Sequence, residues 1–155
     1  MKTSCSHSQK KSSLKKFLFL VFVLVSLTSS AVTYTAVASG NWDADATWSG
    51  TGIPGAGDDV VIEDGKTISV NISNAACNSM NLGTGGLFTA SCTLSFASSS
   101  AQLTTGAIQF GSLLSTCVLD MSNGGTIISS TWTVTSASFT YGTGTVKFTG
   151  TFTLP

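Results

Sequence analysis

The feature that most limits the fold of this chain is a series of short runs with an apolar residue at every second position. Ser, Thr, Asn and other small or polar residues fill the alternate positions. This alternation is typical of short strands with one buried and one solvated face, and no apolar set recurs at helical spacing over a helix length. We therefore predict an all-β fold. The runs are Ile68-Val70-Ile72, Met80-Leu82, Cys92-Leu94-Phe96, Ile108-Phe110, Cys117-Leu119-Met121, Trp132-Val134 and Val146-Phe148.

The spacing of these runs leaves two all-β architectures open, a β-solenoid and a β-sandwich. Turn-forming stretches separate the runs, among them Gly83-Thr84-Gly85-Gly86 and Asn123-Gly124-Gly125. We favour the β-solenoid because the strands are very short and most turns lack a hairpin dipeptide of the Asn-Gly type. Ser- and Thr-rich outer faces also suit coils that stack on their neighbours, and such coils tolerate an imprecise repeat. The β-sandwich is the alternative.

The N-terminus has the three-part pattern of a secretory signal peptide. A lysine-rich segment precedes the apolar run from Phe17 to Val25, and small residues from Ser26 to Ala31 follow it. The apolar run is shorter than the roughly 20 residues that a spanning helix needs, so an uncleaved anchor is the less favoured alternative. We predict a signal peptide over residues 1–31, a β-solenoid domain over residues 32–155, and a secreted or cell-surface location.

Removal of residues 1–31 leaves 155 − 31 = 124 residues with few cations. Lys66 and Lys147 are the only basic residues after the leader, against seven acids, so the charge of this part is 2 − 7 = −5. The single histidine, His7, belongs to the leader. Such a chain cannot neutralise phosphates, so nucleic acid is excluded as a partner, and membrane insertion after signal cleavage is not expected.

Three cysteines follow the leader, and two of them lie at equivalent places in their runs. Cys92-x-Leu94-x-Phe96 and Cys117-x-Leu119-x-Met121 share a phase. If the two runs lie on successive coils, they are about 4.8 Å apart and Cys92 can bond to Cys117. If the run Ile108-Phe110 forms an intervening coil, the distance doubles to about 10 Å and no bond forms. Cys77 is out of phase with its own run and is left over; all three cysteines could also be small buried hydrophobes.

The stretch from Gly40 to Val70 resembles the opening segment of the G-eight domain, a β-rich extracellular module found at the start of large bacterial adhesin-like surface proteins. The resemblance implies right-handed parallel β-helix coils, an extracellular setting associated with glycans or adhesion, and no defined catalytic set. The later segment Phe139–Gly150 is similar to the coil repeats of those proteins. The residues that carry the resemblance are Trp42, Trp48, Gly50, Pro54, Gly57-Asp58, Val60, Ile62, Gly65 and Val70.

The densest acidic cluster comprises Asp58, Asp59, Glu63 and Asp64. Carboxylate oxygens are the ligands that calcium prefers, so the cluster is a candidate calcium site. Apart from calcium at this cluster, we expect no cofactor. The spacing matches neither an EF-hand loop nor a glycine-rich calcium repeat. The favoured interpretation is structural: Asp58 bonds turn amides after Gly57, and Asp64-Gly65 closes the turn between two strands.

A second candidate site lies in the lead-in to the first strands, where Asp43 and Asp45 lie between Trp42 and Trp48. Carboxylates beside aromatic rings are what a sugar-binding or glycosidase cleft needs. The favoured alternative is that both tryptophans plug the end of the first coil while the acids stay in solvent. A tryptophan buries enough area for that role.

The residues that follow the leader offer little for catalysis. No histidine is present there to activate a serine or threonine, and neither lysine has a recognisable partner motif. We therefore predict a non-catalytic surface or adhesion module, a β-helical scaffold that contacts glycans or cell-surface components. The alternatives are the N-terminal fragment of a carbohydrate-active β-helix enzyme and a plain structural solenoid.

The sequence finishes at Phe152-Thr153-Leu154-Pro155 without a capping helix or a polar cap strand. A solenoid that stopped there would present an uncovered sheet edge. We therefore expect the domain to be truncated at this end, with further coils of its own longer polypeptide as a partner. If the chain is complete, the same edge is an assembly surface.

Overall fold

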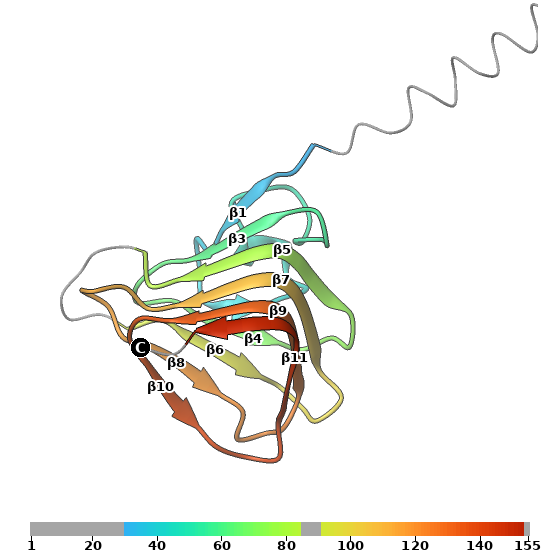
Figure 1. The fold of residues 1–155 in the computed structure, drawn as a ribbon. Coiled ribbons are helices and arrows are strands. Elements are labelled where there is room, and N and C mark those ends of the chain that lie inside the picture. Colours follow the sequence, from blue (N-terminus) through green and yellow to red (C-terminus); the bar gives the residue numbers. More distant parts are fainter. Residues whose placement is uncertain (1–29, 85–90, 154–155) are drawn as a thin grey trace, which may run out of the picture. The chain divides into compact units, whose positions relative to one another are not determined.

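The protein is an all-β parallel β-helix, which confirms the predicted solenoid rather than the sandwich (Figure 1). The computed structural model describes residues 30–84 and 91–153, so residues 1–29 of the expected signal peptide lie outside the described residues. One compact unit spans Ala31–Pro155. Its first sheet contains, in spatial order, β1 (Thr33–Thr35), β3 (Asp59–Ile62), β5 (Ala75–Leu82), β7 (Gln102–Phe110), β9 (Thr126–Val134) and β11 (Thr145–Thr153). The second contains β10 (Ala137–Thr140), β8 (Cys117–Asp120), β6 (Thr93–Phe96), β4 (Thr67–Val70) and β2 (Gly40–Asn41).

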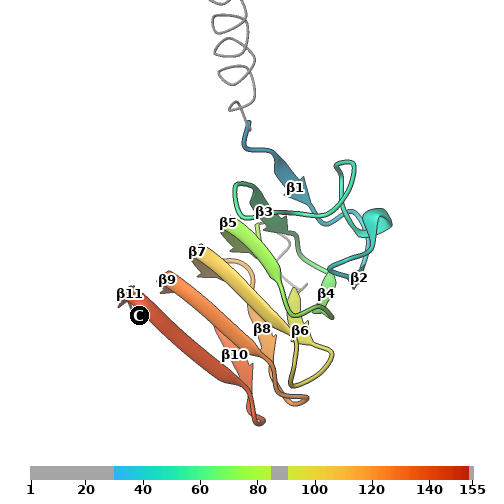
Figure 2. The same cartoon turned by 90° about the vertical axis from the view of Figure 1, so that its right-hand side faces the viewer.

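The chain alternates between the two sheets, so each strand pairs in parallel with the strand two elements away in sequence (Figure 2). This register stacks like residues into columns through the core. In the first sheet Val60 lies beside Met80, Met80 beside Ile108, and Ile108 beside Trp132. The members of this column are all buried. Each fully buried aliphatic side chain contributes about 1.5–3 kcal/mol, so the columns supply the main stabilising term.

The long strands β5, β7 and β9 bend in the middle, and the bend reverses the phase of their inward residues. On β7, Leu103 and Thr105 are buried before the bend, whereas Ile108 and Phe110 are buried after it. The Thr105 hydroxyl donates to the carbonyl oxygen of Ala107 at 2.8 Å, across the bend. One coil further on, the Ser129 hydroxyl makes the equivalent bond to Thr131 at 2.8 Å. The two hydroxyls, which lie inside the solenoid, thus have a hydrogen-bond acceptor across the bend.

Cys77 occupies the same inner corner one coil earlier, directly beside Thr105. The bend explains why this cysteine is buried although it is out of phase with Met80 and Leu82. It is a free thiol, and burial raises its pKa to about 11. A thiol in that state is a poor nucleophile, so Cys77 acts as a small packed side chain.

The structure joins Cys92 and Cys117 in a disulfide, with 4.8 Å between their Cα atoms. The run Ile108-Phe110 lies on β7 in the other sheet, so it does not separate β6 from β8, which pair directly. The disulfide therefore joins adjacent coils, which is the first of the two arrangements considered from the sequence.

The glycines of two turns, Gly124-Gly125 and Gly142-Thr143-Gly144, are required for different reasons. Gly124 and Gly125 adopt φ angles of 89° and 94°, which disfavour any residue with a Cβ. Gly142 and Gly144 have no positive φ; a Cβ there would collide with the backbone of Met121 and with its side chain. The second turn therefore requires glycine for close approach between coils.

Within the described ranges, no helix has both the length and the apolar character needed to cross a bilayer.

Candidate functional site

The lead-in that carries Trp42 and Trp48 folds over one end of the solenoid. The short helix η1 (Asp45–Thr47) reverses the chain between the two tryptophans, so both rings enter the core. Trp42 is 0% exposed and Trp48 is 3% exposed. The rings pack edge to face with 5.2 Å between centroids, and the Trp48 indole N–H donates to the carbonyl oxygen of Trp42 at 2.8 Å. This is the placement that a plug requires.

Hydrogen bonds from backbone groups and from two side-chain hydroxyls hold the lead-in against the first strands. The Ser49 N–H donates to the Thr35 carbonyl at 2.9 Å, and the Ser49 hydroxyl accepts from the Thr35 N–H at 2.9 Å. The Val37 N–H donates to the Thr47 carbonyl at 2.9 Å, and the Thr47 hydroxyl donates to the Asn41 carbonyl at 3.0 Å. The lead-in therefore bonds to outward-facing groups at the end of β1 and at Asn41 of β2.

Asp43 and Asp45 stay on the surface, each with a local partner. Asp43 Oδ1 accepts from the Asn71 amide at 2.7 Å, and Asp45 Oδ1 accepts from the Gly52 N–H. The four predicted residues do not form a cleft: Trp42 and Trp48 lie in the core, whereas Asp43 and Asp45 lie on the surface. Because both ring faces are buried, Trp42 and Trp48 offer no platform on which a sugar could stack.

Three residues of the candidate calcium site, Asp58, Asp59 and Asp64, accept hydrogen bonds from different partners. Asp58 accepts from the Gly55 N–H at 2.9 Å and from the Val32 N–H at 3.1 Å, as expected for a residue that shapes a turn. Asp64 is buried and accepts a hydrogen bond from the Ser115 hydroxyl. The two residues are 51 positions apart, and the sequence did not predict this contact. Among the described residues, no group of three or more metal-type ligands gathers in one place. These contacts agree with a structural role for Asp58 and Asp64, whereas calcium binding by Asp58, Asp59, Glu63 and Asp64 stays a prediction.

Asp59 shows the clearest electrostatic effect in this cluster. Its carboxylate accepts from the Ser79 hydroxyl at 2.6 Å and from the Asn78 amide at 3.0 Å. These two hydrogen bonds, that from Ser79 first, lower its pKa below the ordinary value of 3.8. The ionised form is thus favoured in the folded state. Asp120 has a pKa lowered in the same direction by the Ser122 N–H and then by the Ser122 hydroxyl.

We expect Asp59→Asn to reduce the acid sensitivity of the fold. A lowered pKa contributes stability that is present in full above the unfolded value of 3.8 and is lost as pH falls through the lowered folded value. Chemical denaturation from pH 7 down to pH 2 checks this. The difference in unfolding free energy between wild type and Asp59→Asn should shrink as pH falls below about 4. Curves that stay parallel throughout would show that Asp59 does not carry the effect.

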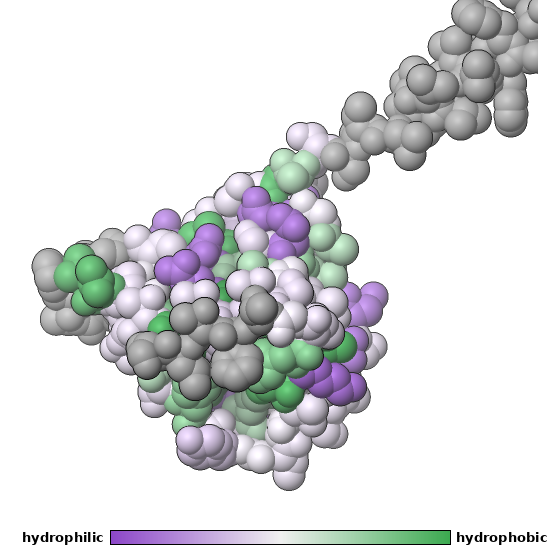
Figure 3. Space-filling model, viewed as in Figure 1, coloured by the Kyte–Doolittle hydropathy of each residue, from purple (hydrophilic) through white to green (hydrophobic). Residues whose placement is uncertain are grey.

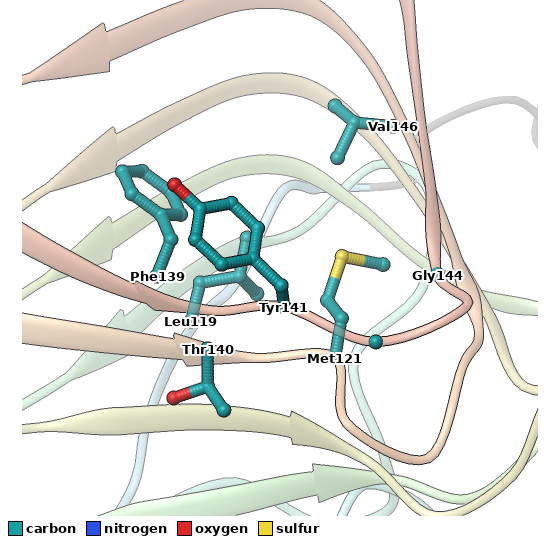
Figure 4. Close-up of a pocket in the computed structure, with 8 residues that line it drawn as sticks. Leu119, Met121, Phe139, Thr140, Tyr141, Gly144 and Val146 are labelled. Carbon is teal, nitrogen blue, oxygen red and sulfur yellow. The ribbon is translucent and has the colours of Figure 1, made fainter.

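An aromatic cluster at the opposite end of the solenoid was not expected from the sequence. Trp132 lies 4.8 Å from Phe110, 6.5 Å from Phe139 and 5.6 Å from Phe148, measured between ring centroids. A hollow of about 220 Å³ opens beside the cluster, with Leu119, Met121, Phe139 and Tyr141 in its lining (Figure 4). The cluster and the hollow draw residues from several coils, so inspection of one run at a time does not bring them together.

No family model, curated protein or solved structure matches the chain. The likeness of Gly40–Val70 to a G-eight opening segment therefore stays a prediction.

Proposed function

We propose that the β-solenoid unit is a non-catalytic scaffold of an exported surface protein, in an adhesive or glycan-associated setting. The burial of Trp42 and Trp48 carries this proposal. These are the two residues that most suggest ligand recognition in the sequence, and both close the core instead. The lead-in is better suited to fixing the end of a rigid rod than to holding a sugar.

Two observations support export. The N-terminal segment combines lysines, a short apolar run and small residues in the order of a secretory leader. The Cys92–Cys117 disulfide is the kind of crosslink that persists in oxidising compartments outside the cytosol. Both features are expected of one exported chain.

The described residues also support a role without catalysis. Asp58 and Asp59 are engaged with turn and neighbouring-coil groups, and the Lys66 ammonium donates to the Val37 carbonyl at 3.0 Å. Each of these side chains has a partner that serves the fold. No observation in the described part of the chain favours the alternative of a carbohydrate-active enzyme fragment.

Expression of the full chain in a secreting host tests the proposal. We expect the chain outside the cytosol with its N-terminus at Val32, as read by mass spectrometry, and no release of new reducing ends from a panel of polysaccharides. A matched variant with Leu20→Arg and Val21→Arg in the apolar run should stay inside, because charges there abolish the leader. Retention of the wild-type chain inside the cell would contradict export, and new reducing ends would contradict a non-catalytic role.

A second experiment measures whether the exported protein is retained on immobilised glycans, which distinguishes a scaffold from a glycan-binding site at the lead-in. We expect Asp43→Asn with Asp45→Asn to leave any retention unchanged, with or without a calcium chelator. Retention that this pair abolishes, without a change in unfolding midpoint, would instead make the lead-in a recognition site.

A further inference from the structure

Val32, the residue that follows the expected leader cleavage site, is held by the fold on both sides of its backbone. Its N–H donates to Asp58 Oδ1 at 3.1 Å, and its carbonyl oxygen accepts from the Asp59 N–H at 2.9 Å. Strand β1 begins at the next residue, Thr33, which pairs with Asp59. The leader pattern predicts cleavage between Ala31 and Val32. The sequence pattern and the hydrogen bonds of the fold therefore meet at the same nitrogen atom.

The carboxylate of Asp58 is oriented by contacts that do not involve the leader. Its Oδ2 accepts from the Gly55 N–H at 2.9 Å, and the Asp58 N–H donates to the Gly55 carbonyl at 3.0 Å, so the side chain closes its own turn. The Asp58 carbonyl oxygen accepts from the Asn78 N–H at 2.7 Å, which joins this turn to β5. These contacts direct the second carboxylate oxygen, Oδ1, at the Val32 nitrogen.

The surroundings of this nitrogen are exposed and acidic. Ala31 and Thr33 are exposed, and Val32 is 44% exposed. Six of the seven acids of the sequence lie between Asp43 and Asp64. Figure 3 shows hydrophilic surface where Figure 1 places β1 and β3. A positive charge at Val32 is therefore attracted to this part of the molecule.

Leader cleavage changes the chemistry of the Val32 nitrogen. A signal peptidase adds water across the Ala31–Val32 peptide bond, so the Ala31 carbonyl carbon takes the hydroxyl group and the Val32 nitrogen takes the hydrogen. The new carboxyl group then loses a proton and leaves with the leader as a carboxylate, while the new amine takes up one proton and becomes an ammonium near neutral pH. A neutral N–H donor is thus replaced by a cation with three donors, and hydrogen bonds to charged groups are stronger than neutral ones.

We propose that Asp58 binds the α-ammonium group that leader cleavage creates at Val32, an inference that rests on the proposed export of the chain. Asp58 then has two roles: it shapes its own turn, and it anchors the new N-terminus beside the start of β3. The anchor matters because β1 pairs with β3 over only three residues. Leader removal therefore strengthens the attachment of the first strand, so the processed protein is held together better at this end than its precursor.

Thermal unfolding of the processed and the leader-retaining forms of the chain tests the proposal. The processed form is the exported product, with an N-terminus at Val32 by mass spectrometry. The leader-retaining form is the variant with Leu20→Arg and Val21→Arg, purified with its disulfide oxidised. All samples contain a calcium chelator, so that calcium cannot take the place of the ammonium. We expect Asp58→Asn to lower the unfolding midpoint by about 1–3 °C more in the processed form than in the leader-retaining form, the scale of an exposed ion pair.

Asp43→Asn is the matched control, because it removes the same charge from an exposed acid whose carboxylate contacts Asn71 instead of Val32. It should change the midpoints of the two forms equally. The difference that Asp58→Asn produces between the forms should shrink in about 1 M sodium chloride, where the Debye length is about 3 Å.

The outcomes separate this inference from the proposed function. If the exported product begins at Val32 but Asp58→Asn lowers both midpoints equally, the ammonium is not bound by Asp58 and export stands. An exported product that begins at another residue would also overturn the inference alone. A chain that stays inside the cell with its leader attached would overturn both.

Discussion

Trp42→Ala is expected to lower the free energy of unfolding by about 3–5 kcal/mol, the range for truncating a large buried aromatic residue. Trp42 is 0% exposed, packs edge to face on Trp48, and supplies the carbonyl to which the Trp48 indole donates. Its truncation leaves a cavity at this end of the core. Denaturation in urea, followed by circular dichroism, measures the change.

Two further substitutions serve as controls for Trp42→Ala. Trp42→Phe should cost less than Trp42→Ala, because it keeps most of the packed area and removes an indole N–H that is buried without a hydrogen-bond partner in the described structure. Leu113→Ala, at an exposed position, should change stability by no more than about 0.5 kcal/mol. If Trp42→Ala costs as little as Leu113→Ala, the tryptophan is not a plug.

Removal of the disulfide is the second large effect that we expect. The bond closes a loop with a sequence separation of 25, and its loss restores conformational freedom to the unfolded chain. The variant with both Cys92→Ala and Cys117→Ala should lose about 3–4 kcal/mol. Alanine is the appropriate substitute because both cysteines are fully buried, where a serine hydroxyl would need a partner.

Reductant provides the control for the disulfide. Reduction should lower the stability of the wild type towards that of the double variant and leave the double variant unchanged. Cys77→Ala removes a buried thiol that forms no disulfide, so this variant should remain as sensitive to reductant as wild type. A wild type whose stability reductant does not alter would contradict the Cys92–Cys117 bond.

The period-two pattern of apolar residues was sufficient to predict the fold class, because each short strand buries one of its two faces. Alternation such as Cys92-Leu94-Phe96 buries one face of a strand, and the same rule places Ile68 and Val70 inside. Identical phase also placed Cys92 beside Cys117, although the sequence alone could not decide whether another coil lay between them. That question depends on which sheet each run joins, and only the structure answers it.

Alternation failed where the chain turns a corner. Cys77 and Met80 are both inside, three positions apart, because β5 bends between them. The hydroxyls of Thr105 and Ser129 mark the same corner in the following coils, yet in sequence they look like ordinary outward residues. The bond from Ser115 to Asp64 is a further case, since it joins the connection after β3 to the connection after β7, two coils further along the chain.

The two ends of the solenoid show how much of the candidate site the sequence could reveal. Trp42 and Trp48 stood out as rare, large residues in a turn-rich stretch, and plugging followed from their size. The β10–β11 end did not stand out, because Phe139, Tyr141 and Phe148 look like ordinary members of strands. Phe139 and Phe148 both lie beside Trp132, and the sequence does not reveal this proximity because the three residues belong to different strands.

Native-state hydrogen exchange on Trp42→Ala and wild type tests the closed solenoid most directly. Each coil of a solenoid contacts only its neighbours, so damage at one end should spread by coil. We predict that the variant loses amide protection first in β1, β2 and β3, with β9 least affected. An equal loss of protection in every strand would contradict both the plug and the coil-by-coil architecture.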